Sequence, residues 1–112
     1  MKIYHNSNCS KSNCALELIK EKGISPQVIN YLQDTPSKEE LIKLLSMLGL
    51  KPFDIIRKKE EIFQQNYAGK TFSDEQWLEI LVEHPILIER PIVVKDGKAV
   101  IARPTERILE LL

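Results

Sequence analysis

The stretch Ile3-Tyr4-His5-Asn6-Ser7-Asn8-Cys9-Ser10-Lys11-Ser12-Asn13 decides the fold of this chain. Two apolar residues begin a short strand, a polar turn follows, and helical spacing of apolar residues starts at Ser12. The pattern predicts a strand, a tight turn and a helix, with Cys9 in the turn. A thiol at that place lies near the positive end of the helix dipole, which favours the thiolate.

Cys9 is therefore our candidate nucleophile. A helix N-terminus can lower the pKa of a cysteine from about 8.5 to between about 3.5 and 7.5. The alternative is a buried structural thiol, which is the commoner role of a free cysteine. The neighbours of Cys9 are all polar, and this favours the reactive interpretation; they are Asn6, Ser7, Asn8, Ser10, Lys11 and Ser12.

The second cysteine, Cys14, is expected to have a structural role. It stands four residues before Leu18 on the apolar stripe of the helix expected at 12–21, so we expect it to pack in the core. An offset of five helical residues turns Cys9 and Cys14 away from each other. The spacing also differs from the Cys-x-x-Cys of dithiol redox enzymes, and we expect no disulfide.

Length and composition restrict the class of protein. The 112 residues suffice for one domain with a single core. There are 16 basic and 16 acidic residues, so no global charge would hold nucleic acid or an anionic membrane. No apolar run approaches the roughly 20 residues of a membrane span, and no Cys/His spacing matches a zinc site. Because polar residues follow Met1-Lys2 at once, we expect no secretory leader. We expect a cytoplasmic monomer without a metal and without nucleic-acid or membrane partners.

The rest of the chain predicts an α/β fold. A second strand near 28–32 completes a β-α-β unit with two parallel strands. A helical segment follows at about 37–84. Asp96-Gly97 between two apolar runs predicts a β-hairpin, and Pro104 opens a last helix. The order β-α-β, helical insertion, β-β-α predicts a single thioredoxin-like domain, 1–112, with a four-stranded mixed sheet.

Two helix starts are marked inside the helical segment. Ser37 with Glu40, and Ser73 with Gln76, have the spacing of capping boxes. Trp77 lies on the apolar stripe of the second of these helices, so we expect it in the core and not on a ligand-binding surface.

Two Arg-Pro dipeptides flank the expected hairpin. Arg90-Pro91 precedes its first strand and Arg103-Pro104 follows its second, and these two ends of a hairpin lie side by side. We expect a cis peptide bond at Arg90-Pro91, because only X–Pro bonds adopt cis at low cost. Composition alone does not decide whether the three arginines share an anion site. Arg57 could belong to a solvated basic run, Arg90 could pair with Glu89, and Arg103 could pair with Glu106.

At this point the residues resemble a known family. Four segments are similar, in the same order and over nearly the whole chain, to the glutaredoxin-dependent arsenate reductases. They are His5-Asn6-x-x-Cys9-Ser10-x-Ser12, Ile56-Arg57-Lys58, His84-Pro85-Ile86-Leu87-Ile88-Glu89-Arg90-Pro91-Ile92-Val93-Val94, and Ala102-Arg103-Pro104-Thr105-Glu106.

The resemblance implies a thioredoxin-like fold with an added helical part, and it implies roles for six residues. Cys9 would be the thiolate that attacks arsenic, assisted by His5 and Ser12. The guanidinium groups of Arg57, Arg90 and Arg103 would hold the oxyanion, and such groups bind oxyanions bidentately.

The resemblance also implies a reaction sequence without a tightly bound cofactor. Cys9 displaces an oxygen of arsenate, glutathione attacks as co-substrate, and glutaredoxin reduces the mixed disulfide while arsenite is released. One protein cysteine suffices in this scheme. Asn13 is a departure, because well-known members of the family carry an arginine there.

For the two residues that would assist the thiolate, His5 and Ser12, the sequence also allows other roles. His5 could raise the thiolate fraction as a nearby cation or donor, or it could lie exposed in solvent. Ser12 could be a simple helix N-cap.

Two rival functions have the same fold. One is a glutathione-linked thiol oxidoreductase, in which the arginines would bind a glutathione carboxylate. The other resembles Spx-type regulators, which bind RNA polymerase and sense oxidation through Cys-x-x-Cys. Here Ser12 stands at the second cysteine position, and the three arginines have no use in a pure binding module.

Overall fold

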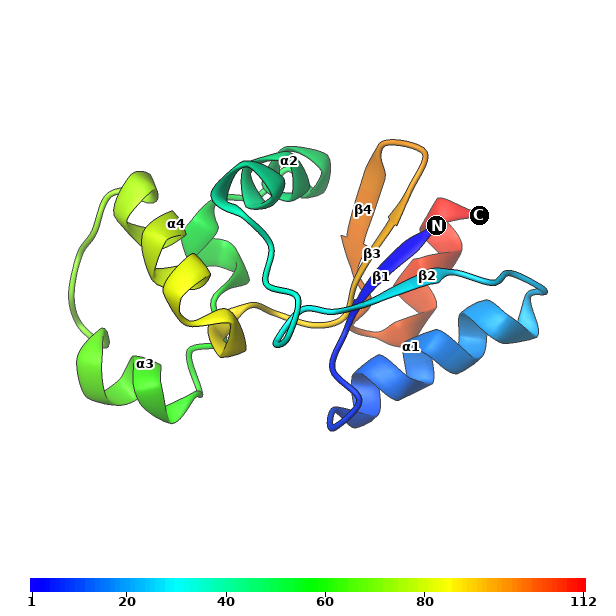
Figure 1. Ribbon diagram of the computed structural model, residues 1–112, viewed down its shortest axis with the longest axis horizontal. Helices are drawn as coiled ribbons and strands as arrows, with labels where there is room; N and C mark the ends of the chain where they lie inside the picture. The colour runs from blue at the N-terminus through cyan, green and yellow to red at the C-terminus, as the bar shows by residue number, and fades with distance from the viewer. The chain divides into compact units, whose positions relative to one another are not determined.

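The computed structural model describes all 112 residues in two compact units, of which the first joins both ends of the chain: Met1–Asp34 and Arg90–Leu112. The first unit is built on a four-stranded sheet (Figure 1). The strands lie in the order β2-β1-β3-β4; they are β1 (Lys2–His5), β2 (Gln27–Asn30), β3 (Ile92–Lys95) and β4 (Lys98–Ile101).

The pairing of the strands confirms the predicted mixed sheet. β1 is central: it runs parallel to β2, with Ile3 opposite Val28, and antiparallel to β3, with Ile3 opposite Val93. β3 and β4 form the predicted hairpin. Both turn residues have positive φ, 51° at Asp96 and 77° at Gly97, as a two-residue type I′ turn requires.

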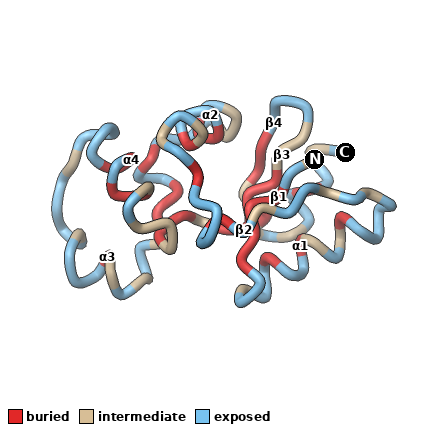
Figure 2. Tube along the Cα trace, viewed as in Figure 1, coloured by how far each residue is buried: buried red, intermediate tan, exposed pale blue.

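The core of the first unit lies between the sheet and two helices. These are α1 (Ser10–Glu21) and a C-terminal 3₁₀ helix (Thr105–Leu111), which contact each other and the sheet. Figure 2 shows the buried positions along β1, β3 and β4. The buried cluster unites all of these elements; it comprises Ile3, Ala15, Ile19, Val93, Val100, Ala102 and Ile108.

The prediction that Cys14 packs in this core is wrong, because its side chain is exposed. The buried stripe of α1 runs through Ser12, Ala15 and Ile19, at helical spacings of three and four residues. Cys14 is one residue, or about 100°, away from that stripe. As expected, Cys9 and Cys14 form no disulfide, and both are free thiols.

The second unit, Thr35–Glu89, is helical. Its helices are α2 (Lys38–Leu48), α3 (Glu61–Asn66) and α4 (Asp74–Glu83), with 3₁₀ turns at Pro52–Ile55 and Pro85–Leu87. This agrees with the helical segment predicted at about 37–84. The prediction that both units form one domain stays a prediction.

Capping explains where two of these helices begin. The Ser37 hydroxyl accepts a hydrogen bond from the backbone N–H of Glu40, and Ser73 and Gln76 form a complete capping box. Trp77 on α4 is buried, and its ring centroid is 4.9 Å from that of Phe72, as expected of a core residue.

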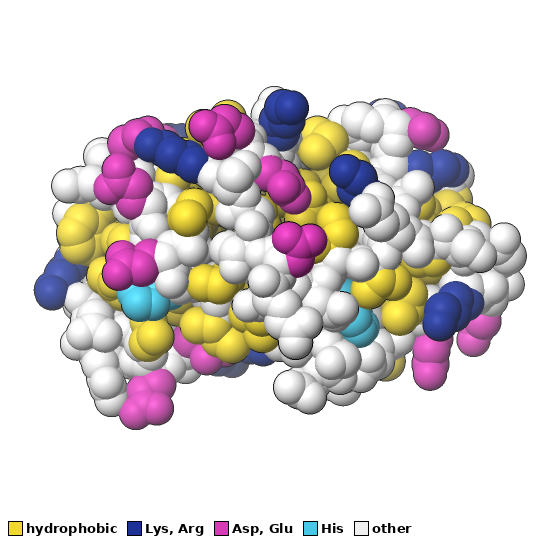
Figure 3. Space-filling view, viewed as in Figure 1, with side chains coloured by type: hydrophobic (Ala, Val, Ile, Leu, Met, Phe, Trp, Pro, Cys, Tyr) yellow, Lys and Arg dark blue, Asp and Glu magenta, His cyan; other side chains and the backbone are white.

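One helical feature differs from the expectation. The last helix, Thr105–Leu111, is a 3₁₀ helix, a form used in short segments. No helix of the structure combines the length and apolar character needed to cross a membrane. Figure 3 shows basic side chains interspersed with acidic ones on the face drawn, consistent with the balanced charge.

Candidate active site

Cys9 lies in the turn that connects β1, the central strand of the first unit, to helix α1. β1 ends at His5, and Cys9 is the N-cap residue of α1. The backbone N–H of Cys9 donates to the carbonyl of Asn6 at 2.9 Å, and the N–H of Asn13 donates to the carbonyl of Cys9 at 3.1 Å. The thiol is therefore fixed at a helix N-terminus, as the sequence predicts.

Three polar side chains hold the shape of the turn. The Asn6 side-chain carbonyl accepts from the N–H of Asn8 at 3.0 Å, and the buried Ser12 hydroxyl accepts from the N–H of Asn6 at 3.3 Å. The Asn13 amide donates to the carbonyl of Ser7 at 3.0 Å. Asn13 thus fastens the turn to α1, a role that sequence reasoning missed.

Arg103 brings a positive charge to the thiol. Its Nη2 lies 3.5 Å from the Sγ of Cys9, and its Nε donates to the carbonyl of Arg90 at 2.6 Å. The peptide bond between Arg90 and Pro91 is cis, which confirms the prediction, and the bond between Arg103 and Pro104 is cis as well. The two ends of the hairpin therefore meet beside the thiol turn.

Arg90 is the most deeply placed charge of this site, with 8% of the residue exposed. Its Nη1 donates to the hydroxyl of Tyr31 at 3.3 Å, just beyond the end of β2. Burial by itself lowers the pKa of Arg90, but Tyr31 and Cys9 raise it above its usual value, so the guanidinium stays charged. Tyr31 was missed from the sequence; the only signal was a hydroxyl at the carboxyl end of a strand.

The environment of Cys9 favours its thiolate. Burial raises the pKa of the Cys9 thiol, but hydrogen bonds from the backbone of Ser12 and from the Arg90 guanidinium lower it by more, with a further contribution from the backbone of Lys11. The net pKa lies below that of a free cysteine. The helix N-terminus and the arginine act together, which is the reactive interpretation of Cys9.

The lowered pKa of Cys9 can be tested by measuring its rate of alkylation as a function of pH. Only a thiolate reacts with iodoacetamide, so the labelling rate rises with pH through the pKa of Cys9. Since folding lowers that pKa, we expect the plateau at a lower pH in the folded protein than in the protein unfolded in urea. Mass spectrometry of the Cys9 peptide gives both profiles. A folded profile at or above the unfolded one would contradict the thiolate assignment.

His5 lies beside the site, where it is buried and uncharged. The residue is 5% exposed, so the solvent-exposed alternative is wrong. Burial and the positive charge of Lys20 lower the pKa of His5, against a smaller opposing effect of the Ser12 backbone. Because an unperturbed imidazole titrates near 6.5, His5 is neutral at pH 7. Any assistance that it gives to Cys9 must come from a neutral ring.

Ser12 is not the helix N-cap, because α1 begins at Ser10 and its cap is Cys9. Ser12 is instead fully buried in the first turn of the helix. Its backbone stabilises the Cys9 thiolate, and its hydroxyl holds Asn6. Ser12 therefore assists the thiolate through its backbone in the first turn of α1, and not as an N-cap residue.

Arg57 belongs to the second unit. Its Nε lies 3.1 Å from a carboxylate oxygen of Glu60, and its backbone N–H donates to the carbonyl of Leu87 at 2.7 Å. The residues that the structure brings together in the first unit are therefore Cys9, Arg90 and Arg103, with His5 at the end of β1 and Ser12 in the first turn of α1. The role of Arg57 at this site stays a prediction.

The arrangement suits attack on a small oxyanion. A thiolate is the nucleophilic form of cysteine, and guanidinium groups beside it can hold several anionic oxygens while keeping their protons. The same positive charges would stabilise negative charge that develops on oxygen during attack.

Comparisons with known proteins agree with this chemistry. The model of the ArsC family matches residues 4–111 of the chain. An arsenate reductase of Escherichia coli is 40% identical over 111 residues, which are 98% of this chain and 79% of that protein. Another Escherichia coli protein, the uncharacterized YfgD of strain K12, is 42% identical over 114 residues, covering all of this chain and 96% of its own.

A solved structure is similar over nearly its full length. The arsenate reductase from Vibrio cholerae superimposes with a TM-score of 0.95 at 47% identity, covering 99% of this chain and 96% of that one. The likeness therefore includes both the sheet-based unit and the helical unit.

Proposed function

Since this chain belongs to the ArsC family, we propose that it reduces arsenate to arsenite with glutathione as the co-substrate and glutaredoxin as the final reductant. The observation that carries the proposal is the contact between the Cys9 thiol and Arg103, with the buried Arg90 on the same site. The named relatives among the comparisons include arsenate reductases.

In the first step the Cys9 thiolate attacks arsenic. An S–As bond forms, one As–O bond breaks, and the oxygen leaves as water after protonation. Arg90 and Arg103 would bind the remaining oxygens and stabilise the charge on them. A lowered thiol pKa serves this step, because it keeps the nucleophile deprotonated near neutral pH.

In the second step an external thiolate, glutathione, attacks the Cys9 sulfur. An S–S bond forms, the S–As bond breaks, and its electron pair stays on arsenic, which leaves as arsenite. Glutaredoxin and a second glutathione then reduce the mixed disulfide on Cys9. No second protein cysteine is required in this scheme.

Arsenite formation by the purified protein tests the proposal. With arsenate, glutathione and glutaredoxin present we expect steady turnover, and we expect none when glutathione is omitted. Absence of arsenite with all components would contradict the proposal. In that case reduction of a small disulfide would support the oxidoreductase alternative, and co-purification with RNA polymerase would support the regulator.

A further inference from the structure

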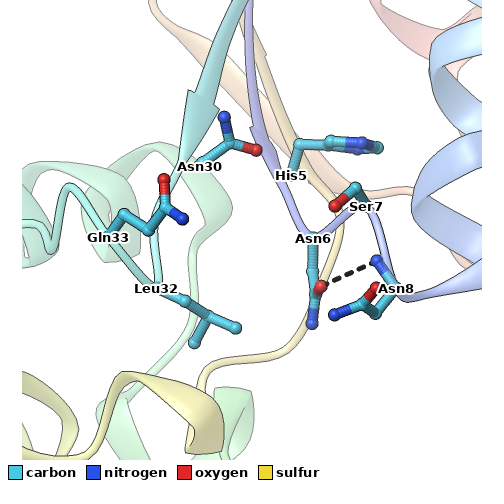
Figure 4. Close-up of a pocket in the computed structure, with 7 residues that line it drawn as sticks. All are labelled: His5, Asn6, Ser7, Asn8, Asn30, Leu32 and Gln33. Atoms are coloured by element: carbon cyan, nitrogen blue, oxygen red, sulfur yellow. Dashed lines mark hydrogen bonds between the residues drawn. The ribbon is translucent and has the colours of Figure 1, made fainter.

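A hollow of about 190 Å³ lies beside the thiol turn in the first unit. One wall is the turn that carries Cys9, with Asn6 and Asn8, and the other is the end of β2, with Asn30 and Gln33. Figure 4 shows the carboxamides of these two walls on opposite sides of the space, with Leu32 between them. The hollow thus begins one residue from the nucleophile.

The amides on the β2 side are unused by the protein. The side chains of Asn30 and Gln33 are exposed and make no hydrogen bond within the chain. Figure 4 shows both carboxamides directed into the space, whereas the His5 ring points away from it. Each carboxamide offers two donor hydrogens and one acceptor oxygen, so together they can bind a ligand that itself donates and accepts.

The charge of the lining indicates the class of ligand. No acidic or basic side chain lines the hollow, and the one histidine of the lining, His5, has a lowered pKa and is neutral at pH 7. A site for a phosphate or a lone carboxylate is expected to contain Arg or Lys, which bind these anions through charge-assisted hydrogen bonds. Carboxamides with one apolar side chain, Leu32, instead match a neutral peptide group, which carries one N–H and one C=O beside short methylene chains.

The proposed reaction requires a second thiol, which a ligand with a peptide group could carry. Reduction of arsenate to arsenite takes two electrons, and two thiols give up two electrons when they form one disulfide. Cys9 contributes one thiol. Cys14 is five residues further on, exposed on α1. Because an offset of five helical residues turns Cys14 away from Cys9, the proposed scheme takes the second thiol from outside, and that thiol has to approach the Cys9 sulfur.

We propose that the Asn6/Asn8–Asn30/Gln33 hollow binds the peptide portion of the external thiol and so directs its sulfur to Cys9. This rests on the proposed function, in which glutathione is that thiol. The occupant is a small peptide thiol, since the hollow of about 190 Å³ has room for part of a tripeptide.

Thiol–disulfide exchange tests the hollow without arsenate. In a Cys14→Ser background, the Cys9 thiolate attacks glutathione disulfide, forms the Cys9–glutathione disulfide and releases one glutathione thiolate. Mass spectrometry gives the rate. The same reaction with bis(2-hydroxyethyl) disulfide, which has no peptide group, reports the nucleophile alone. The test variant is Asn30→Ala/Gln33→Ala, and the control is Gln27→Ala, an exposed amide at the opposite end of β2.

We expect the double variant to lose about tenfold in rate with glutathione disulfide, as for two neutral hydrogen bonds, and to keep its rate with the hydroxyethyl compound. Gln27→Ala should change neither rate. Equal loss with both disulfides, or no loss with either, would overturn the proposal. A protein that shows the selective loss but forms no arsenite would retain the peptide-thiol site and refute arsenate reduction, so the two failures are distinct.

Discussion

Cys9→Ser is expected to remove arsenite formation to the level of the reaction without protein, a loss of at least about a thousandfold in kcat. A serine hydroxyl is not ionised near neutral pH, so the stabilisation that the α1 N-terminus and Arg90 give to a thiolate has nothing to act on. The measurement is arsenite release with saturating glutathione and glutaredoxin. Circular dichroism and thermal unfolding show whether the variant is folded.

Cys14→Ser is the matched control for this substitution. It removes the other free thiol, which is exposed and lies off the buried stripe of α1, so neither fold nor turnover should change. Normal turnover in Cys9→Ser would end the proposed mechanism. A comparable loss in Cys14→Ser would show instead that the second thiol comes from the chain, and would contradict the use of an external one.

The parts of the fold that depend on neighbouring residues were predictable from the sequence. The hairpin follows from Asp96-Gly97, where both turn residues adopt positive φ, and the start of α4 follows from the Ser73–Gln76 capping box. The position of Cys9 at the start of α1 is of the same kind. In each case short-range hydrogen bonding or backbone sterics decides the conformation.

Features that depend on the phase of a helix or on tertiary contacts were not predictable to the same degree. Moving the start of α1 from Ser12 to Ser10 changes which residue caps the helix, and a difference of about 100° separates a buried from an exposed Cys14. α3 has six residues and follows a run of charges, so its sequence carries little periodicity.

The reactive groups of the site were predictable from the sequence, but the hydrogen-bond network that holds them was not. Cys9, Arg90 and Arg103 have chemically distinctive side chains that the family pattern identifies. Tyr31 and Asn13 were not identified because their hydrogen bonds, with Arg90 and with Ser7, exist only in the folded chain. A tyrosine or an asparagine in a sequence has too many ordinary uses to indicate either.

Arg90→Lys is the second substitution with a large expected effect. The change keeps the positive charge but replaces a planar, forked donor by a single ammonium group. A lysine at this buried position can no longer span Tyr31 and the Cys9 thiolate together as the guanidinium does. A hydrogen bond to a charged group contributes roughly 1.5–3 kcal/mol, so we expect kcat/KM for arsenate to fall by about tenfold to a hundredfold.

A second measurement separates this effect from a general loss of structure. The pKa of Cys9 depends in part on Arg90, so the alkylation profile of Arg90→Lys should shift to higher pH than that of the unchanged protein. Arg107→Lys is the control, because Arg107 is exposed and pairs with Glu110; it should alter neither kcat/KM nor the profile. If Arg90→Lys behaves like Arg107→Lys in both measurements, the guanidinium neither activates the thiol nor binds the oxyanion, and Arg103 alone would have to provide the positive charge seen at the sulfur.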